Sequence, residues 1–192
     1  MPLVVPYVNL PQLRTFPRPT GLRQTHNTQQ TASVGERYVD SEDKLRAAIG
    51  EVAARFRFDA AGIPSAAGGA IVIAGSFTVG ATVVIPPRCS LLTIRSLPGC
   101  TLYPDAADQG VLFTLQASRV TIRDLFVFYK TTAGAPSGWF NTFVQAENGD
   151  PVDGVQIDPN ACRILGNVAF ADRLYVDASA DQADGTLIAD NE

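Results

Sequence analysis

The sequence contains very few of the side chains that most often carry catalysis or bind metals. Its 192 residues include one histidine, His26, and three cysteines, Cys89, Cys100 and Cys162. The cysteines have no C-x-x-C spacing, and with a single histidine they cannot supply a recognisable zinc ligand set. A Ser-His-Asp or Cys-His arrangement is also excluded, because His26 lies in a polar segment without apolar anchors. We therefore expect no metal, no cofactor and no catalytic residue, and three reduced cysteines that behave as small buried hydrophobes.

Long apolar runs are missing as well. No run approaches the roughly 18 residues that a membrane-spanning helix needs, so we expect no membrane insertion. Charged residues make up 18% of the chain and hydrophobic residues 46%, a composition typical of a globular domain. The formal net charge is −4, and the basic residues are too sparse to argue for nucleic-acid binding. No glycine-rich loop joins a strand to a helix, as phosphate binding would require.

Proline is plentiful, and it concentrates near the N-terminus. The stretch VVPYVNLPQLRTFPRPTG alternates prolines with aliphatic and aromatic residues, which favours an extended or polyproline-like backbone. Such a segment cannot bury enough apolar surface alone to offset its ordering entropy. We therefore interpret residues 1–39 as an extended docking arm that binds another protein. The residues expected to contact that partner are Val5, Tyr7, Leu10, Leu13, Arg14, Phe16, Arg18 and Arg23.

The charges are distributed unevenly along the chain. Residues 1–39 hold four arginines against one glutamate, whereas residues 145–192 hold ten acids against two arginines. One interpretation is that the basic arm binds an acidic surface of a neighbouring molecule, such as the acidic C-terminal part of another copy. The other interpretation is that these charged residues form an ordinary solvated surface.

One convincing helix is predicted, over residues 40–58, DSEDKLRAAIGEVAARFRF. Asp40 is a suitable N-cap, and two acids in the first turn complement the helix dipole. The positions Leu45, Ile49, Val52 and Phe56 form one apolar stripe. The glycine-rich and alanine-rich stretch AAGIPSAAGG then ends the helix. Residues 40–64 are therefore expected to form a helix and a linker.

From residue 65 onward the sequence is typical of strands. Short runs such as AIVIAG, ATVVIPP, LLTIRS and VLFTLQ are rich in Val, Ile, Thr and Phe and are separated by turn residues. No second helical pattern interrupts them, which argues against a βαβ sheet. The remaining choice is between a β-sandwich and a coil of stacked strands.

An internal repeat favours the coil. The stretch SLLTIRSL, residues 90–97, returns as SRVTIRDL, residues 118–125, at an offset of 28 residues. Each turn of a parallel β-helix places equivalent residues above one another, whereas a sandwich gives no reason for such a recurrence. We therefore predict that Ile94 and Ile122 stack in one core column and that Thr93 and Thr121 stack outside it.

A third, weaker copy follows in NACRILGNVAF. Matching Asn167 to Asp124 requires an offset of 43 residues, which is explained by an inserted loop at residues 131–142, TTAGAPSGWFNT. Trp139 and Phe140 in this loop are candidates to stack on a sugar ring or on a partner surface. The alternative is that both fold back on the strands.

Part of the chain resembles a known family. The relevant features are the sequence SEDKLRAAIGEVAARF, a Gly-Gly before the first strand at Gly68 and Gly69, the segment Phe77 to Val79 and the Ile-Pro step at Ile85. Together they look like the opening of right-handed parallel β-helix proteins of the pectate-lyase and phage tailspike type. The turn AGSF departs from the family's usual Pro-Gly-x-Tyr. The resemblance covers about residues 40–130. It implies a mainly β fold, a short right-handed parallel β-helix over residues 65–192, with one N-terminal capping helix and an extended N-terminal arm.

Pectate lyases and many tailspikes cut polysaccharides, so the resemblance makes the acids candidates for a catalytic pair. Glycoside hydrolysis needs two carboxylates about 5 to 10 Å apart. The acids near the predicted strands are Asp105, Asp108, Asp124, Asp153, Asp158, Asp172 and Asp177. The sequence singles out no pair among them, so no catalytic residue is assigned. Arg95 and Arg123 would stack as like charges, and Asp124 is the expected partner.

The resemblance and the arm together imply a bacteriophage virion structural protein. It would be a short tail spike or fibre component or a head-decorating protein, assembled in the host cytoplasm and docked on other virion proteins through its arm. By analogy with tailspikes it would be a homotrimer, with host surface polysaccharide as a further partner. The alternatives are a polysaccharide-degrading tailspike enzyme, lyase or glycosidase-like, or its remnant, and a carbohydrate-binding module.

Overall fold

The computed structural model describes residues 35–65, 68–105, 109–132, 135–179 and 185–192. The chain divides into two compact units, Met1–Gly35 and Glu36–Glu192, and the account that follows concerns the second. All eight arm residues predicted to contact a partner lie outside the described residues.

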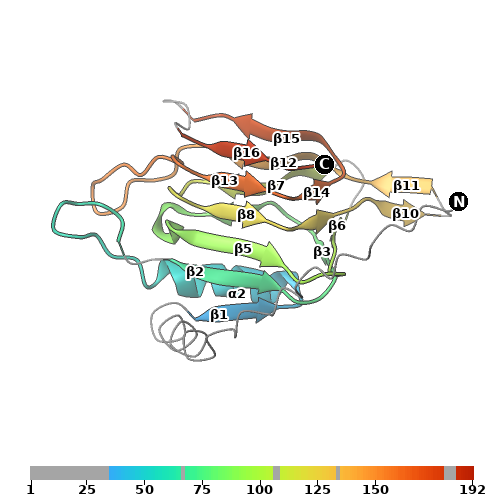
Figure 1. Ribbon diagram of the computed structural model, residues 1–192, viewed down its shortest axis with the longest axis horizontal. Helices are drawn as coiled ribbons and strands as arrows, with labels where there is room; N and C mark the ends of the chain where they lie inside the picture. The colour runs from blue at the N-terminus through green and yellow to red at the C-terminus, as the bar shows by residue number, and fades with distance from the viewer. Residues whose placement is uncertain (1–34, 66–67, 106–108, 133–134, 180–184) are drawn as a thin grey trace, which may run out of the picture. The chain divides into compact units, whose positions relative to one another are not determined.

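The described chain is mainly β, with one α-helix (Figure 1). The helix is α2 (Glu42–Ala53), and a short 3-10 helix, η1, covers Pro87–Cys89. The first strands are β1 (Glu36–Val39), β2 (Gly69–Ile73), β3 (Phe77–Val79), β4 (Val83–Ile85), β5 (Leu92–Ser96), β6 (Leu102–Pro104), β7 (Gln109–Leu115) and β8 (Thr121–Arg123). The remaining strands are β9 (Phe126–Val127), β10 (Lys130–Thr132), β11 (Ala135–Gly138), β12 (Phe140–Ala146), β13 (Arg163–Leu165), β14 (Val168–Ala169), β15 (Ala171–Asp177) and β16 (Leu187–Ala189). The expectation of a mainly β chain with a single helix is confirmed.

Most of the strands belong to three parallel sheets. The first sheet has the order β1-β2-β5-β8-β13-β16, the second β14-β9-β6-β3, and the third β15-β12-β7-β4. Every strand pair within these three sheets is parallel. Apart from the hairpin β10–β11, the chain visits the three sheets in turn from β2 to β15, so each circuit adds one strand to each sheet, while β1 and β16 extend the first sheet alone. Figure 1 shows the first sheet in front, with its strands rising from blue to red.

The register of the first sheet follows the sequence repeat. Ile94 and Ile122 are paired residues of β5 and β8, as the offset of 28 residues predicts. Ile71 pairs with Ile94 on one side, and Ile164 pairs with Ile122 on the other. These four isoleucines have no exposed area, while the neighbouring Thr93 and Thr121 are half-buried. The predicted core column is therefore confirmed.

The predicted alignment of the third copy was wrong by one residue. Ile164 pairs with Ile122 and Val168 with Phe126, which is an offset of 42 residues, not 43. The turns explain the shift, because Gly166 and Asp124 both have left-handed backbone, with φ of 61° and 56°. Aligning these two residues places Asn167 beside Leu125, not beside Asp124.

The helix is shorter at both ends than predicted. Its N-cap is Ser41, whose extended backbone lets the side chain accept a hydrogen bond from the Lys44 N–H at 3.4 Å. Asp40, the predicted cap, instead forms an ion pair with the Lys44 ammonium group. At the other end the backbone tightens, because the Phe56 N–H donates to the carbonyl of Ala53. Phe56 therefore lies beyond the helix, yet it is buried in the core at 2% exposure.

Helix α2 covers one end of the core. Leu45, Ile49 and Val52 are buried and belong to the same apolar cluster as the strand residues. Figure 1 shows α2 directly behind β2. An uncovered sheet end exposes apolar side chains, so this covering stabilises the first circuit.

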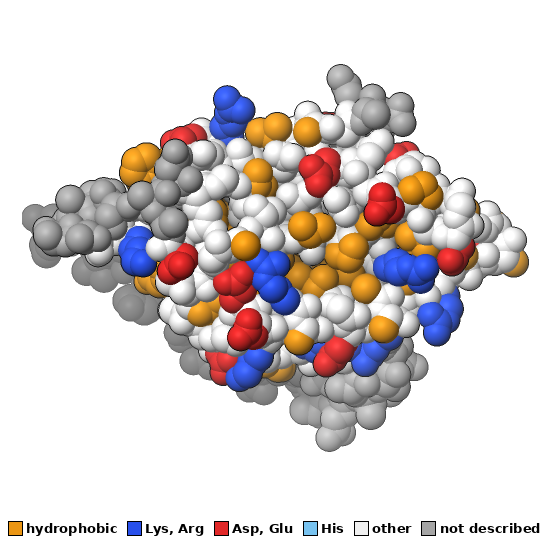
Figure 2. Space-filling view, turned by 180° about the vertical axis from the view of Figure 1, so that it is seen from behind, with side chains coloured by type: hydrophobic (Ala, Val, Ile, Leu, Met, Phe, Trp, Pro, Cys, Tyr) orange, Lys and Arg blue, Asp and Glu red, His pale blue; other side chains and the backbone are white. Residues whose placement is uncertain are grey.

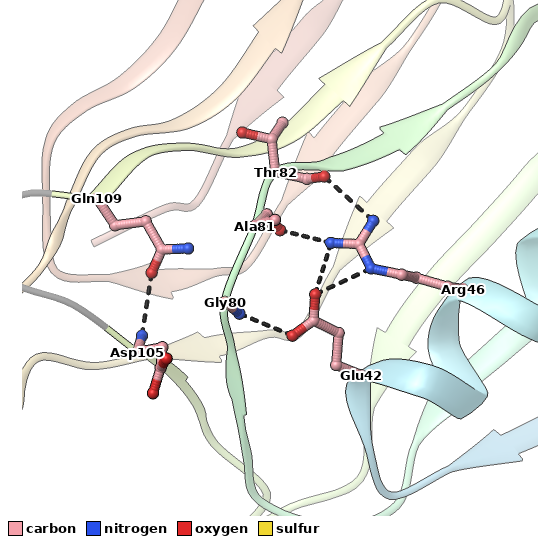
Figure 3. A network of polar contacts seen from close by, with 7 residues as sticks. All are labelled: Glu42, Arg46, Gly80, Ala81, Thr82, Asp105 and Gln109. Carbon is pink, nitrogen blue, oxygen red and sulfur yellow. Dashed lines mark hydrogen bonds and ion pairs between the residues drawn. The ribbon is translucent and has the colours of Figure 1, made fainter.

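Polar contacts hold α2 to the turn between β3 and β4 (Figure 3). The Glu42 carboxylate accepts from the Gly80 N–H at 2.7 Å and from Arg46 at 2.6 Å. Arg46 also donates to the carbonyls of Ala81 and Thr82, at 2.7 and 3.2 Å. The helix therefore has both apolar and ionic attachments to the strands.

Two segments lie in unforeseen strands. Residues 36–39, at the end of the expected arm, form β1 and pair with β2. The expected insertion at 131–142 forms part of the antiparallel hairpin β10–β11 and then the start of β12. No helix among the described residues is long and apolar enough to span a membrane.

Candidate functional site

The predicted loop residues have different environments. Phe140 begins β12, pairs with Gln109 of β7 and Ala171 of β15, and has no exposed area. It packs in the core and presents no ring to a ligand. Trp139 is half-buried, and its carbonyl accepts from the Gln109 N–H at 3.0 Å. Only Trp139 of this pair retains exposed surface.

Several of the acids considered for catalysis are engaged by neighbouring groups. Asp105 lies 3.7 Å from the Lys130 ammonium group, Asp124 lies 3.8 Å from Arg123, and Asp153 lies 3.3 Å from Arg88. Asp177 accepts a hydrogen bond from the Ser179 side chain. Asp108 lies outside the described residues. Within the described ranges, no group of three or more His, Cys, Asp or Glu residues could hold a metal ion.

The stacked arginines have different partners. Arg95 and Arg123 are paired residues of β5 and β8, as expected. Asp124 lies beside Arg123, but the partner of Arg95 is Glu36 of β1, at 3.0 Å. The pKa of Glu36 is lowered, chiefly by the hydrogen bond from the Tyr38 hydroxyl and then by that from Arg95. Sequence reasoning missed Glu36 because it did not foresee β1.

An exposed group of aromatic side chains is the most distinctive surface feature. We name it the aromatic ridge, and it consists of Phe126, Phe128, Tyr129 and Phe170. The three phenylalanines are 43–44% exposed, although large apolar side chains are usually buried. The Tyr129 ring lies 4.5 Å from that of Phe128 and 4.7 Å from that of Phe170, measured between ring centroids.

The alternation of strand side chains creates the ridge. Val127 of β9 points into the core and has no exposed area, so Phe126 and Phe128 on either side of it point outward. The Phe170 N–H donates to the Val127 carbonyl at 2.9 Å, which places Phe170 beside Phe128 in the next circuit. In the preceding circuit the Phe128 N–H donates to the Leu102 carbonyl at 3.0 Å. Phe128 and Phe170 thus occupy equivalent positions of two successive circuits.

The ridge is bordered by an ion pair. Lys130 follows Tyr129 in the chain, and its ammonium group donates to the Asp105 carbonyl at 2.9 Å besides approaching the carboxylate. An apolar aromatic surface with a polar border is typical of sites that bind a protein partner or stack on a sugar ring. The signal in the sequence is FVFYK, where alternation places Phe126 and Phe128 on the same face of the strand.

A shallow pocket of about 320 Å³ lies elsewhere, between the turn at Gly62–Pro64 and residues 155–161. Its lining includes Arg119, Asp158 and Asn160. One side-chain oxygen of Asp158 and one of Asn160 are buried without a hydrogen-bond partner among the described residues. The lining combines apolar side chains, such as Ile63 and Val155, with charged groups of both signs.

The face opposite to that of Figure 1 also carries exposed apolar groups. Figure 2 shows hydrophobic side chains near the middle of this face, with charged side chains of both signs around them. Val84 of β4, 41% exposed, is among the exposed apolar residues of the molecule.

The three cysteines are free thiols, and two of them are buried. Burial raises the pKa of Cys89 to about 12 and that of Cys162 to about 11. Cys100 is half-buried. The expectation of small buried side chains is confirmed for Cys89 and Cys162, whose thiols stay protonated at neutral pH.

The fold and the site together define a mainly β protein with three parallel sheets and an exposed aromatic ridge. Comparison with known proteins finds no relative: no family model matches the chain, and no curated protein or solved structure is significantly similar to it.

Proposed function

We propose that the chain is a bacteriophage virion structural protein, a short tail spike or fibre component or a head-decorating protein. Its body is a short right-handed parallel β-helix, and the arm that precedes β1 docks it on other virion proteins. The observation that supports the proposal is the strand order, in which consecutive strands of the chain belong in turn to three parallel sheets, together with a helix whose apolar residues join the core cluster. This arrangement suits a rigid rod mounted at one end.

The turns support the solenoid part of the proposal. Leu91, Arg119 and Ala161 have left-handed backbone just before β5, β8 and the β13 segment, with φ of 69°, 57° and 54°. Their N–H groups link successive turns, as in the bonds from Leu91 to the Ser118 carbonyl and from Arg119 to that of Asn160. Equivalent strained positions in successive circuits are expected where the same turn is repeated along a stack.

The arm carries the docking part of the proposal. Its arginines can pair bidentately with carboxylates of a neighbour, while its aromatic and aliphatic residues fill pockets. A homotrimer, by analogy with tailspikes, would present three such arms to the particle.

Deletion of residues 2–30 tests this function. The truncated body should keep its circular dichroism spectrum and melting temperature, whereas its incorporation into particles should be lost. A variant with three arm arginines replaced, Arg14→Gln, Arg18→Gln and Arg23→Gln, should show reduced incorporation at unchanged stability. Incorporation of the truncated protein at normal copy number would contradict the proposal.

A second candidate function is carbohydrate binding, and the aromatic ridge favours it. Exposed aromatic rings with neighbouring polar groups can stack on sugar rings. The triple variant Phe128→Ala, Tyr129→Ala and Phe170→Ala should then lose binding to host surface polysaccharide, measured by isothermal titration. The matched control is Val84→Ala, another exposed apolar residue. Undiminished binding by the triple variant would rule out the ridge as the site.

A further inference from the structure

The sequence contains one asparagine that is followed directly by glycine, at Asn148–Gly149. Glycine has no Cβ, so its N–H can approach the side chain of the preceding residue with little steric hindrance. Attack of that N–H on the asparagine carboxamide is the first step of deamidation, a reaction that makes asparagine a thermolabile residue. In a folded chain this attack depends on the bonds that hold the two groups.

Both reacting groups lack hydrogen bonds within the part of the chain that the structure describes. The segment that carries them follows β12, which ends at Ala146, and belongs to no helix or strand. The Asn148 side chain is half-buried, and its carboxamide oxygen is buried without a partner among the described residues. The Gly149 N–H likewise has no partner in the described ranges. No hydrogen bond of the described fold therefore has to break before the N–H attacks the carboxamide.

Two asparagines elsewhere in the fold are held more firmly. The Asn167 carboxamide accepts from the Leu125 N–H at 3.1 Å and donates to the Ile122 carbonyl at 3.2 Å. The N–H that follows it in the chain, that of Val168, donates to the Leu125 carbonyl at 2.9 Å. The Asn191 carboxamide accepts from the Asn167 N–H at 3.0 Å. These bonds would have to break before either side chain could be attacked.

We propose that Asn148 is a site of spontaneous covalent modification in the folded protein. The Gly149 nitrogen bonds to the Asn148 carboxamide carbon, and the bond from that carbon to the side-chain nitrogen breaks. Ammonia leaves with the proton that the Gly149 N–H gives up, and a five-membered succinimide ring remains. Water then opens the ring at one of its two carbonyl carbons, which leaves an aspartyl or an isoaspartyl linkage at position 148. One water is consumed and one ammonia is released, so the reaction needs no oxidant or reductant.

The isoaspartyl linkage would act at a tightly packed point. It lengthens the main chain by one methylene group directly before Gly149. A Cβ atom at Gly149 would lie 2.6 Å from Pro87 Cγ and 2.9 Å from Gln116 Cβ, so a shift of the backbone toward these residues meets their atoms. The Gly149 carbonyl also accepts from the Gln156 side chain at 3.3 Å. We expect the modified chain to lose part of this contact between the segment after β12 and η1.

Modification also adds a carboxylate to an acidic segment. Glu147 precedes the site, and Asp150 and Asp153 follow it. Arg88 of η1 pairs with Asp153 at 3.3 Å, so the added charge has one nearby basic group for several acids. Like charges close together disfavour the folded state. Because neither product returns to asparagine, the stability of the chain should fall with its age.

Ageing of the full folded chain at mildly alkaline pH, followed by mass spectrometry of its peptides, tests the proposal. Residue 148 should gain the mass difference between an amide and an acid at least about tenfold faster than the hydrogen-bonded Asn167 and Asn191. A parallel sample in urea gives the rate without the fold. The modified chain, separated by ion exchange, should melt at least about 2 °C lower than the unmodified chain. Asn148→Gln should abolish the product, because its longer side chain cannot form the five-membered ring.

A matched variant separates the effect of the fold from that of the sequence. Val168→Gly creates a second Asn-Gly pair at Asn167, where the carboxamide and the following N–H are both hydrogen-bonded. In the folded variant, checked by circular dichroism, Asn167 should stay intact while Asn148 is converted. Should the variant not fold, the comparison of the natural chain with its urea-unfolded form still decides.

Three results would overturn the proposal. The first is conversion of residue 148 in urea but not in the folded chain, because the fold would then protect the site. The second is conversion of Asn167 as fast as Asn148 in folded Val168→Gly, because the hydrogen bonds would then be irrelevant. The third is an unchanged melting temperature of the modified chain. None of these results depends on particle incorporation by the arm.

Discussion

At the scale of single residues, Gly149 is a position where the packing leaves no room for a side chain. A Cβ atom there would lie 2.6 Å from Pro87 Cγ and 2.9 Å from Gln116 Cβ. Gly149→Ala should therefore destabilise the fold by about 1–3 kcal/mol, the usual cost of overpacking. The matched control is Gly110→Ala in β7, where nothing lies within 4 Å. Urea denaturation should separate the two variants, and equal stabilities would contradict the packing described here.

The Glu42 carboxylate predicts a pH dependence. Burial alone would raise its pKa, but the hydrogen bond from the Gly80 N–H and the contact with Arg46 outweigh burial, so the pKa lies below its usual value of 4.5. Because the folded-state pKa is the lower one, the stabilisation is present above about pH 4.5 and is lost as the pH falls through the folded value.

Glu42→Gln should therefore cost about 1 kcal/mol at neutral pH and less at acidic pH. Melting temperatures of both proteins between about pH 7 and pH 3 measure the difference, which should shrink as the pH falls. A difference that stayed constant across this range would show that the charge of Glu42 contributes nothing.

The thiols give a prediction about reactivity. Cys89 and Cys162 are buried, and burial raises the pKa of each, so neither should react with a thiol reagent in the folded protein at neutral pH. Cys100 is half-buried and should be labelled first. Mass spectrometry of peptides after brief labelling distinguishes them. Labelling of Cys162 as fast as Cys100 would mean that the circuit around it opens readily.

At the scale of elements, α2 should be indispensable as a cover for the first circuit. Ile49 is 5% exposed and faces the core, so Ile49→Asp buries an unpaired charge and should cost several kcal/mol or leave the protein insoluble. Gly50, the next residue, is exposed and has open space around it. Gly50→Ala should instead stabilise the helix by up to about 1 kcal/mol. A soluble Ile49→Asp variant with an unchanged melting temperature would refute the covering role.

Sequence patterns predicted those elements whose signals are local or repeated. The apolar stripe identified α2, and the near-identical contexts of Ile94 and Ile122 predicted their pairing because equal surroundings imply equal positions in a stack. The N-cap was misplaced by one residue, since Asp40 and Ser41 are both good caps. Only the backbone conformation decides between two adjacent candidates.

Other elements could not be predicted from the sequence in this way. β1 is four residues long and pairs with a strand more than 30 positions later, so no local period reveals it. The start of β12 was interpreted as part of an inserted loop because the third copy of the repeat required a longer offset than the first two copies. The aromatic ridge was missed for a related reason: alternation shows that Phe126 and Phe128 share a face, but the burial of Val127 decides which face is outside.

At the scale of the whole molecule, the two ends of the stacked circuits differ. One end is covered by α2 and its ionic contacts, and the other presents β16, with Ile188 partly exposed.

The central claim is that the circuits stack in register around one continuous isoleucine column. Methyl NOE measurements on a chain with ¹³C-labelled isoleucine methyl groups test it most directly. Because paired residues of adjacent parallel strands lie about 4.8 Å apart, cross-peaks should link Ile71 to Ile94, Ile94 to Ile122, and Ile122 to Ile164. Cross-peaks that skip a member of this series, or the absence of any contact between Ile94 and Ile122, would contradict the stacked arrangement.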